Sequence, residues 1–280
     1  MKSAPVNKII PFSNVDGPGN RTSIFFQGCS FHCLFCHNPE TIHMCVACGA
    51  CVAGCPAGAL SVGEGGAILW DDGKCVSCDA CIKTCPHDAS PRVRWMSVDE
   101  VLREVRRSAP YIDGVTTSGG ECTLYNDFLI ELFTQVKALG KTCLIDSNGS
   151  FDFERDPRVL AVCDGVMLDV KAIEPAWSDR LIGHPRDMVL KNLDFLLRAG
   201  KLHEVRTLIF PNRDADNEAT VRYVAARIGR RCGYKIIRYR PFGVRERYQK
   251  LLGEDTTDEA YAERYAQLAR DLGATRAKVI

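Results

Sequence analysis

Three cysteines near the N-terminus have a spacing suited to an iron–sulfur cluster. Cys29, Cys33 and Cys36 follow one another as Cys-x3-Cys-x2-Cys. A [4Fe–4S] cluster normally takes four thiolates, so a local run of three leaves one iron without a protein ligand. An iron with an open position can bind and activate a small molecule, whereas a fully ligated one mainly passes electrons. The alternative is a structural zinc site in which His37 supplies the fourth ligand.

Eight further cysteines form two nearly identical runs, each ending in Cys-Pro. Their shared spacing, Cys-x2-Cys-x2-Cys-x3-Cys-Pro, is that of bacterial two-cluster ferredoxins, in which the fourth cysteine of each run ligates the other cluster. We therefore expect two more [4Fe–4S] clusters, held by two crossed sets. The first set is Cys45, Cys48, Cys51 and Cys85, and the second is Cys75, Cys78, Cys81 and Cys55. Two zinc knuckles are the alternative.

Four cysteines remain, and each stands alone in an apolar segment. Because an isolated cysteine in such a segment behaves as a small hydrophobic residue, we expect all four in the core. They are Cys122, Cys143, Cys163 and Cys232.

Composition narrows the classes of protein that the chain can belong to. The 280 residues suffice for one large domain and a small one. A formal net charge of +1 provides no overall field for nucleic acid or an anionic membrane. The start lacks the apolar core of a signal peptide, and no stretch approaches the roughly 20 apolar residues of a membrane span. We therefore expect a cytoplasmic protein whose cysteines bind metal rather than form disulfides.

After residue 92, short β-branched runs alternate with amphipathic stretches. Ser97 and Glu100 form a capping box at the first helix, and Asn126 can cap a second helix that Gly140 ends. Further helices are expected at 188–199, 218–228 and 258–272. Strands are expected at 22–27, 112–117, 142–146, 165–170, 205–210 and 235–239. Such alternation predicts a parallel sheet with right-handed crossovers.

Polar residues follow several of these strands, where ligands bind in parallel α/β folds. Gly119 and Gly120 lack Cβ atoms, so their backbone can approach a ligand amine. Glu121 could accept that amine or pair with an arginine. Lys171 suits a carboxylate. Asp146 and Asp169 suit a ribose, an ammonium group or a small cation. Together these groups meet the needs of S-adenosylmethionine.

These motifs resemble those of the glycyl-radical-enzyme activases of the radical SAM superfamily. The resemblance rests on residues 15–21 (Val-Asp-Gly-Pro-Gly-Asn-Arg), the cysteine run with His37-Asn38, and segments 118–121, 146–149 and 167–171. It covers nearly the whole chain. Residues 41–90, which carry the two cysteine runs, and residues 10–13 are most similar to the YjjW-type subgroup of this pyruvate formate-lyase activase-like family.

The resemblance implies an α/β fold, an incomplete (β/α)6 radical SAM barrel. Residues 1–40 would form its first part, residues 41–90 a ferredoxin-like insert with two [4Fe–4S] clusters, and residues 91–280 the remainder. The implied activity is reductive cleavage of S-adenosylmethionine to methionine and a 5′-deoxyadenosyl radical, which abstracts hydrogen from a backbone glycine of a partner glycyl radical enzyme. Three [4Fe–4S] clusters and electrons from reduced flavodoxin or ferredoxin would be needed.

The resemblance also implies roles for individual residues. Asp16 and Arg206 would lie near the incoming glycine loop, and a monovalent cation is possible near Asp146 and Asp169. The family usually has a cofactor-binding histidine where this chain reads Arg238-Tyr239-Arg240, so Arg240 would replace it. The catalytic cluster would be bound by Cys29, Cys33 and Cys36. The expected cofactor contacts are Phe35, Cys36, His37, Gly119, Gly120, Glu121, Asp146, Asp169, Val170, Lys171 and Arg240.

Two other functions remain open at this point. One is a radical SAM enzyme that acts on another peptide or a small molecule, which requires a closed substrate pocket. The other is a polyferredoxin-type electron carrier, which leaves the polar residues at the strand ends unexplained. The arginines between residues 227 and 247 either dock a partner or form a solvated basic edge.

Overall fold

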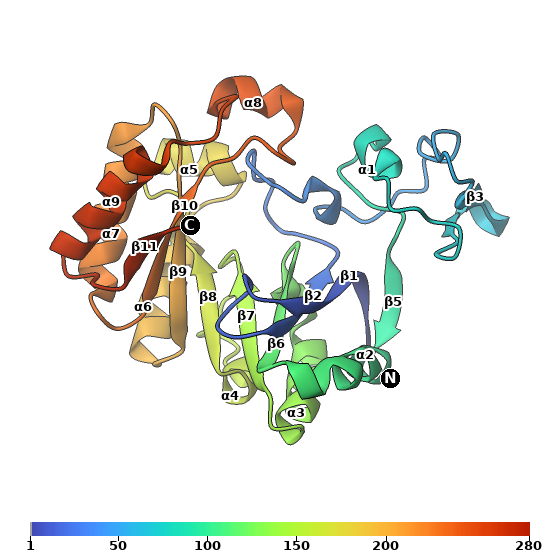
Figure 1. Ribbon diagram of the computed structural model, residues 1–280, viewed down its shortest axis with the longest axis horizontal. Helices are drawn as coiled ribbons and strands as arrows, with labels where there is room; N and C mark the ends of the chain where they lie inside the picture. The colour runs from blue at the N-terminus through green and yellow to red at the C-terminus, as the bar shows by residue number, and fades with distance from the viewer. Residues whose placement is uncertain (1) are drawn as a thin grey trace.

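Six parallel strands form the centre of a curved sheet in the computed structural model, which describes residues 2–280 (Figure 1). Each predicted strand is confirmed to within a few residues. In sheet order the strands are β2 (Arg21–Phe26), β6 (Gly114–Gly119), β7 (Thr142–Ser147), β8 (Gly165–Asp169), β9 (Leu202–Ile209) and β10 (Gly233–Arg238). Their carboxyl ends share one edge, as the parallel arrangement requires.

Three strands that were not predicted extend this sheet on both sides. β11 (Ala277–Val279) pairs in parallel with β10. On the other side, β1 (Ser3–Ser13) is antiparallel to β2, and β5 (Arg94–Ser97) is antiparallel to β1. Pro5 and Pro11 hide β1 in the sequence, since proline normally argues against a paired strand. Because β11 and β5 stand at the two ends of the strand order, the sheet stays open.

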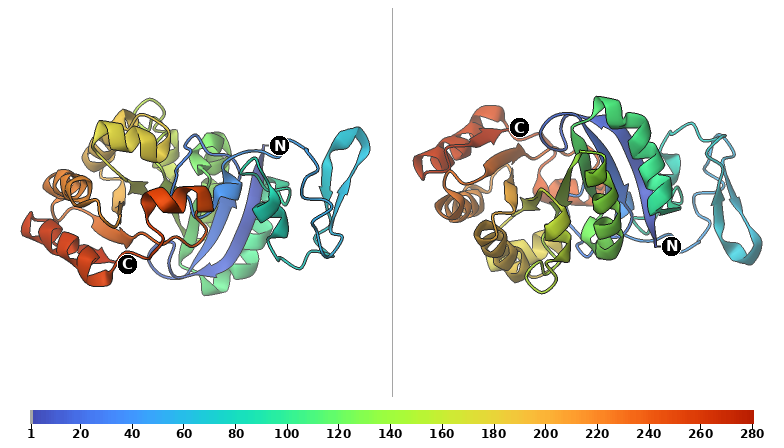
Figure 2. Two further views of the ribbon diagram at one scale, coloured as in Figure 1. Left: turned by 90° about the horizontal axis from the view of Figure 1, so that it is seen from above. Right: turned by 90° about the horizontal axis from the view of Figure 1, so that it is seen from below.

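Helices connect the parallel strands and cover the outer side of the sheet (Figures 1 and 2). The predicted capping box of Ser97 and Glu100 is confirmed at α2. The helices are α2 (Val98–Ser108), α3 (Asn126–Ala138), α4 (Arg158–Val162), α5 (Pro175–Ile182), α6 (Asp187–Arg198), α7 (Asp214–Ile228), α8 (Glu246–Leu252) and α9 (Glu259–Asp271). Short 3-10 turns lie at Pro39–Thr41, Glu64–Gly66, Ala109–Tyr111 and Cys122–Tyr125.

The core between sheet and helices contains the four isolated cysteines, as expected. Cys122, Cys143, Cys163 and Cys232 are all buried among aliphatic side chains. Asn126, by contrast, is the first residue of α3 rather than its cap, and its amide donates to Asp156 instead.

Residues 41–90 leave the sheet after β2 and return to it at β5. They contain the hairpin β3 (Leu60–Val62) and β4 (Ile68–Trp70) and the short helix α1 (Ala80–Thr84). In both views this segment lies to the side of the sheet, with the hairpin farthest out (Figures 1 and 2). The boundaries of the three predicted parts stay predictions.

No helix within residues 2–280 is both long enough and apolar enough to cross a bilayer.

Arg21 joins the amino ends of three strands inside the sheet. Its side chain is almost fully buried, and it donates to Thr116 Oγ1 at 2.7 Å, to the Val115 carbonyl at 2.8 Å and to Thr142 Oγ1 at 3.0 Å. A guanidinium suits this position because its donors lie in one plane and reach β6 and β7 together. Burial lowers the pKa of Arg21.

We expect Arg21→Met to lower the free energy of unfolding by about 3 kcal/mol, because it leaves several buried acceptors without a donor. Denaturant unfolding of the purified protein measures this change. Arg103→Met is the control, since the Arg103 side chain is 67% exposed. Equal effects of the two substitutions would show that the buried network contributes little.

Candidate functional site

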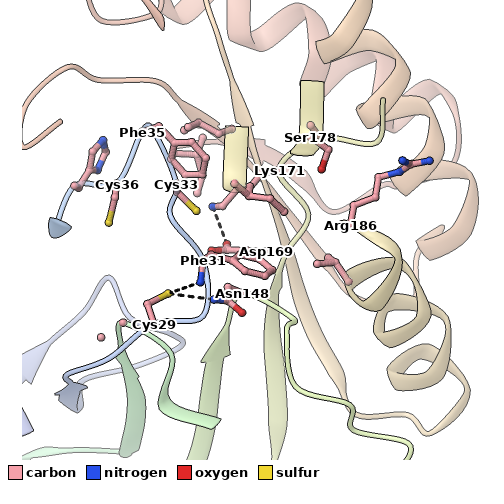
Figure 3. Close-up of a pocket in the computed structure, with 18 residues that line it drawn as sticks. Cys29, Phe31, Cys33, Phe35, Cys36, Asn148, Asp169, Lys171, Ser178 and Arg186 are labelled. Carbon is pink, nitrogen blue, oxygen red and sulfur yellow. Dashed lines mark hydrogen bonds and ion pairs between the residues drawn. The ribbon is translucent and has the colours of Figure 1, made fainter. Parts of the chain in front are cut away.

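The Cys29–Cys36 loop follows β2 and lies over the carboxyl edge of the sheet. Backbone hydrogen bonds from His32 to Ile182 and from Leu34 to Leu181, both 2.9 Å, fix the loop to the end of α5. Figure 3 shows the sulfur atoms of Cys29, Cys33 and Cys36 directed into one shared space. The three predicted ligands are therefore brought together.

A cavity of about 210 Å³ opens beside these cysteines. Much of its wall was predicted from sequence. The predicted residues that line it are Cys29, Cys33, Phe35, Cys36, His37, Gly119, Gly120, Asp169 and Lys171.

The two glycines let the end of β6 lie directly against the cysteine loop. A Cβ on Gly120 would stand 2.0 Å from the Gly28 carbonyl oxygen, and one on Gly119 would stand 2.2 Å from the Phe26 nitrogen. Gly119 also has a φ of +118°, which L-residues rarely adopt. From the sequence we expected these glycines to leave room for a ligand. In the structure they leave room for the backbone of Phe26 and Gly28.

Two hydrogen-bond donors beside Cys29 would stabilise a thiolate there. Asn148 Nδ2 and the Phe31 amide each donate to Cys29 Sγ at 3.4 Å, as they would to a thiolate (Figure 3). Burial raises the pKa of Cys29 to about 12 and that of Cys36 to about 11. Thiols this hard to ionise become ligands when a positive metal displaces their protons. The donor set thus fits an iron–sulfur cluster.

Lys171 and Asp169 form an ion pair on the cavity wall, with Lys171 Nζ 2.9 Å from Asp169 Oδ1. Lys171 Nζ also lies 5.6 Å from the centre of the Phe35 ring, a cation–π distance. The ammonium group thus has an anionic and an aromatic partner on a largely apolar wall, and it can also meet an anionic group of a ligand.

Ser178 and Arg186 also line the cavity, and sequence reasoning missed both. Ser178 Oγ and Arg186 Nε are buried, and neither has a hydrogen-bond partner among residues 2–280. A buried polar atom without a partner costs about 1–3 kcal/mol, so such atoms indicate a missing ligand. They belong to the connection after β8, where neither the strand pattern nor a motif singled them out.

Glu121 lies behind the cavity wall rather than on it. Its carboxylate accepts from the Asn148 amide at 2.7 Å, from Ser147 Oγ at 3.0 Å and from Thr123 Oγ1 at 2.5 Å. Burial raises the pKa of Glu121 to about 7. These contacts replace the expected ligand amine or arginine. Glu121 positions the turn that carries Asn148 against Cys29.

A chain of alternating charges fills the inner side of the sheet below the cavity. Arg206 donates to Asp146 Oδ1 at 2.9 Å and to Glu204 Oε1 at 2.8 Å, and Lys235 lies 3.1 Å from the same Glu204 oxygen. Asp146 and Asp169 thus each face a cation of the protein. The expected monovalent cation between them stays a prediction.

Asp16 lies at the side of this charged interior. Its carboxylate accepts from Ser13 Oγ at 2.6 Å and from Ser23 Oγ at 2.7 Å, and its carbonyl accepts from Thr116 Oγ1. The loop between β1 and β2 is therefore held against the inner face of β2 and β6.

Two expected cofactor contacts lie elsewhere. The Arg240 side chain is exposed, and only its carbonyl is engaged near the site, 3.0 Å from His37 Nε2. His37 thus donates to Arg240 while its ring lines the cavity, and burial lowers the pKa of His37. Val170 is fully buried, with its carbonyl accepting from Thr207 Oγ1. Neither residue is among those that line the cavity, and the expected contact of each with the cofactor stays a prediction.

The remaining eight cysteines line two small hollows in residues 41–90, and the sets match the crossed sets expected from sequence. One hollow is lined by Cys45, Cys48, Cys51 and Cys85. The other is lined by Cys55, Cys75, Cys78 and Cys81. The fourth cysteine of each run thus lies with the other run.

Comparison with known proteins agrees with this geometry. The sequence model described as the radical SAM superfamily matches residues 23–224. The benzylsuccinate synthase activating enzyme of Thauera aromatica is 32% identical, over 98% of this chain and 91% of that protein. The trans-4-hydroxy-L-proline dehydratase activating enzyme of Clostridioides difficile is 33% identical, over 72% of each.

Among solved structures, QueE from Escherichia coli shares the fold. The TM-score is 0.51 at 13% identity, and the match covers 99% of this chain and 94% of that one. At this identity the likeness concerns architecture alone.

We expect Gly120→Ala to expose the cysteine loop, because the added methyl cannot fit between β6 and the Gly28 carbonyl. Mass spectrometry after timed alkylation of the apoprotein should show faster labelling of the segment that carries Cys29, Cys33 and Cys36. Gly140→Ala is the control. It strains a φ of +72°, at a cost of about 1 kcal/mol, but meets nothing within 4 Å. Unchanged labelling in Gly120→Ala would mean that the close contact is not required.

Proposed function

Since the chain belongs to the radical SAM superfamily and, within it, to the glycyl-radical enzyme activating enzymes, we propose that it installs a glycyl radical on a partner enzyme. When bound, the cluster and S-adenosylmethionine supply a reductive cleavage to methionine and a 5′-deoxyadenosyl radical, which takes hydrogen from a backbone glycine of the partner. The observation that carries this proposal is the shared cavity of three cysteines, two close-packed glycines and unpartnered polar groups.

The protein's part at the cluster is to supply three thiolates and to hold their loop. Cys29, Cys33 and Cys36 would ligate three irons and leave one position for the cofactor. Asn148 and the Phe31 amide stabilise negative charge on Cys29. The apolar walls around the loop limit water, which strengthens each of these electrostatic contacts.

Three side chains on the cavity wall would bind the methionyl carboxylate of S-adenosylmethionine. Lys171, Ser178 and Arg186 lie on one part of the wall, and two of them carry a donor that lacks a partner within residues 2–280 (Figure 3). A carboxylate there would satisfy Ser178 Oγ and Arg186 Nε and share the charge of Lys171. Phe35 and His37 would contact the cofactor on the cluster side.

The interior of the sheet can receive the glycine segment of the partner. Arg206 and Asp16 both lie along this interior. Glu204 holds Arg206 in position, and Ser13 and Ser23 hold Asp16. Groups fixed in this way can bind a peptide backbone at small entropic cost. Because the sheet is open, a protein segment could reach this interior between its two edge strands; a closed barrel would block that route.

The eight cysteines of residues 41–90 would hold two further [4Fe–4S] clusters. Their division into two hollows supports crossed ligation. We propose that these clusters relay electrons from reduced ferredoxin or flavodoxin.

The central test is anaerobic. Protein reconstituted with iron and sulfide, then given dithionite and S-adenosylmethionine, should release 5′-deoxyadenosine. With the correct glycyl radical enzyme it should also produce a glycyl doublet in the EPR spectrum of that partner. Cofactor cleavage with no radical on any glycyl radical enzyme encoded beside it would favour another substrate, and no cleavage at all would favour an electron carrier.

Two cysteine substitutions separate the roles of the clusters. Cys33→Ala should abolish cofactor cleavage with every reductant, because it removes a ligand of the open cluster. Cys78→Ala should keep dithionite-driven cleavage and mainly slow cleavage driven by a protein donor. Complete loss of dithionite-driven cleavage in both variants would contradict this division.

We expect Arg186→Met to weaken the binding of S-adenosylmethionine by about tenfold or more, because a charge-assisted hydrogen bond contributes about 1.5–3 kcal/mol. Anaerobic equilibrium dialysis measures the dissociation constant directly. Arg180→Met is the matched control, since Arg180 lies on the exposed side of neighbouring α5. An unchanged dissociation constant in Arg186→Met would remove Arg186 from the binding site.

A further inference from the structure

The chain brings the cysteine loop and both ends of residues 41–90 together at one junction. The Cys29 amide donates to the Ile42 carbonyl at 2.9 Å, and the Gly28 amide donates to Thr41 at 2.8 Å. The His43 amide in turn donates to the Asp88 carbonyl at 3.1 Å. Cys45, the first ligand of the first crossed set, is therefore three residues from a carbonyl that is hydrogen-bonded to Cys29.

Two histidine side chains meet at this junction. His32, next to Cys33, and His43, two residues before Cys45, bring their Nε2 atoms to 2.5 Å. Their ring centres lie 4.4 Å apart. At this separation one ring donates its hydrogen to the lone pair of the other. The pair thus joins the catalytic loop to the first crossed set by a side-chain hydrogen bond.

The histidine rings line an open hollow beside the first crossed set. They share a hollow with Met44 and Val46, which flank Cys45, and with Pro86 and His87, which follow Cys85. The first crossed set is therefore adjacent to the catalytic loop. The hollows of both crossed sets are also lined by the hairpin β3–β4, the first by Ile68 and the second by Leu60 and Trp70.

An ion cluster holds this junction in place. Asp88 Oδ1 accepts from Arg245 Nε at 2.6 Å, and Asp88 Oδ2 accepts from Arg247 at 2.9 Å. Arg245 also donates to the Ile82 carbonyl in α1. Both arginines come from the segment around the start of α8. Two members of the basic stretch at 227–247 are thus occupied within the chain.

We propose that the His32–His43 pair is the bridge through which each electron enters the catalytic site. One electron leaves the cluster on Cys45, Cys48, Cys51 and Cys85, which is oxidised, and reduces the cluster on Cys29, Cys33 and Cys36. A reduced low-potential ferredoxin is oxidised as it supplies this electron through the second crossed set. Tunnelling through bonded and hydrogen-bonded atoms is faster than across a solvent gap, so the hydrogen-bonded rings speed this step beyond the route along the backbone from Ile42 to Cys45. The inference rests on the proposed function.

The test follows reduction of the catalytic cluster itself rather than product. The holoprotein is mixed with saturating reduced ferredoxin and frozen at timed intervals. EPR then follows the cluster signal that changes when S-adenosylmethionine is added. His43→Ala and His32→Ala should each slow the growth of this signal several-fold, with no change in iron content or in its final amplitude.

A double-mutant cycle tests whether the two histidines act as one unit. If they form one bridge, the His32→Ala/His43→Ala double variant should be no slower than the slower single variant. The matched control is His184→Ala. His184 touches the same loop through Phe31, with ring centres 5.1 Å apart, but belongs to the connection between α5 and α6. This variant should reduce at the wild-type rate.

Three outcomes would overturn the bridge. They are wild-type rates in both single variants, equal slowing by His184→Ala, and fully multiplicative slowing in the double variant. If an alanine variant loses iron, His43→Gln, which keeps a hydrogen-bonding side chain, takes its place and should reduce faster than His43→Phe. Failure of the proposed function looks different, since wild-type protein would then show no signal that responds to S-adenosylmethionine.

Discussion

The site depends on a close backbone contact that is possible because the end of β6 consists of two glycines. The end of β6 and the residues after β2 come so close at Gly119 and Gly120 that a single methyl group would collide with main-chain atoms. This contact fixes where the cysteine loop leaves the sheet. It therefore fixes the distance of the three sulfurs from Asp169, at the end of β8, and from Lys171, just after it. The glycines act on the cofactor through the protein backbone, whatever direct contacts they also make.

The charged groups below the cavity and the polar groups on its wall differ in whether they have partners within the described chain. Below the cavity, Asp146, Arg206, Glu204 and Lys235 form a chain of alternating charges in which each member has a partner. Leaving a buried charge without its partner is strongly destabilising, so this chain resists local rearrangement. On the cavity wall, Ser178 and Arg186 keep donors without partners within the described chain. Such groups lower stability unless a ligand satisfies them.

Much of this arrangement could be predicted from the sequence, and the failures have physical reasons. The six central strands were found because strands covered on both faces read as apolar runs. β1 was missed because Pro5 and Pro11 resemble loop residues. Glu121 was placed on the cofactor because its motif suggests it, but its carboxylate satisfies the turn at Ser147 and Asn148 instead. Ser178 and Arg186 were missed because each is marked only by a buried donor that has no partner within residues 2–280, and a sequence does not show hydrogen bonds.

The two ends of residues 41–90 lie side by side, since His43 and Ala89 form an isolated bridge next to β2. A segment whose ends nearly touch can be gained or lost in evolution with little disturbance to its host, because a short turn can close the gap. The ion pairs of Asp88 with Arg245 and Arg247 fasten this segment to the start of α8. A chain shortened across this gap should keep the sheet and the cysteine loop, whereas Arg245 and Arg247 would lose their shared carboxylate partner.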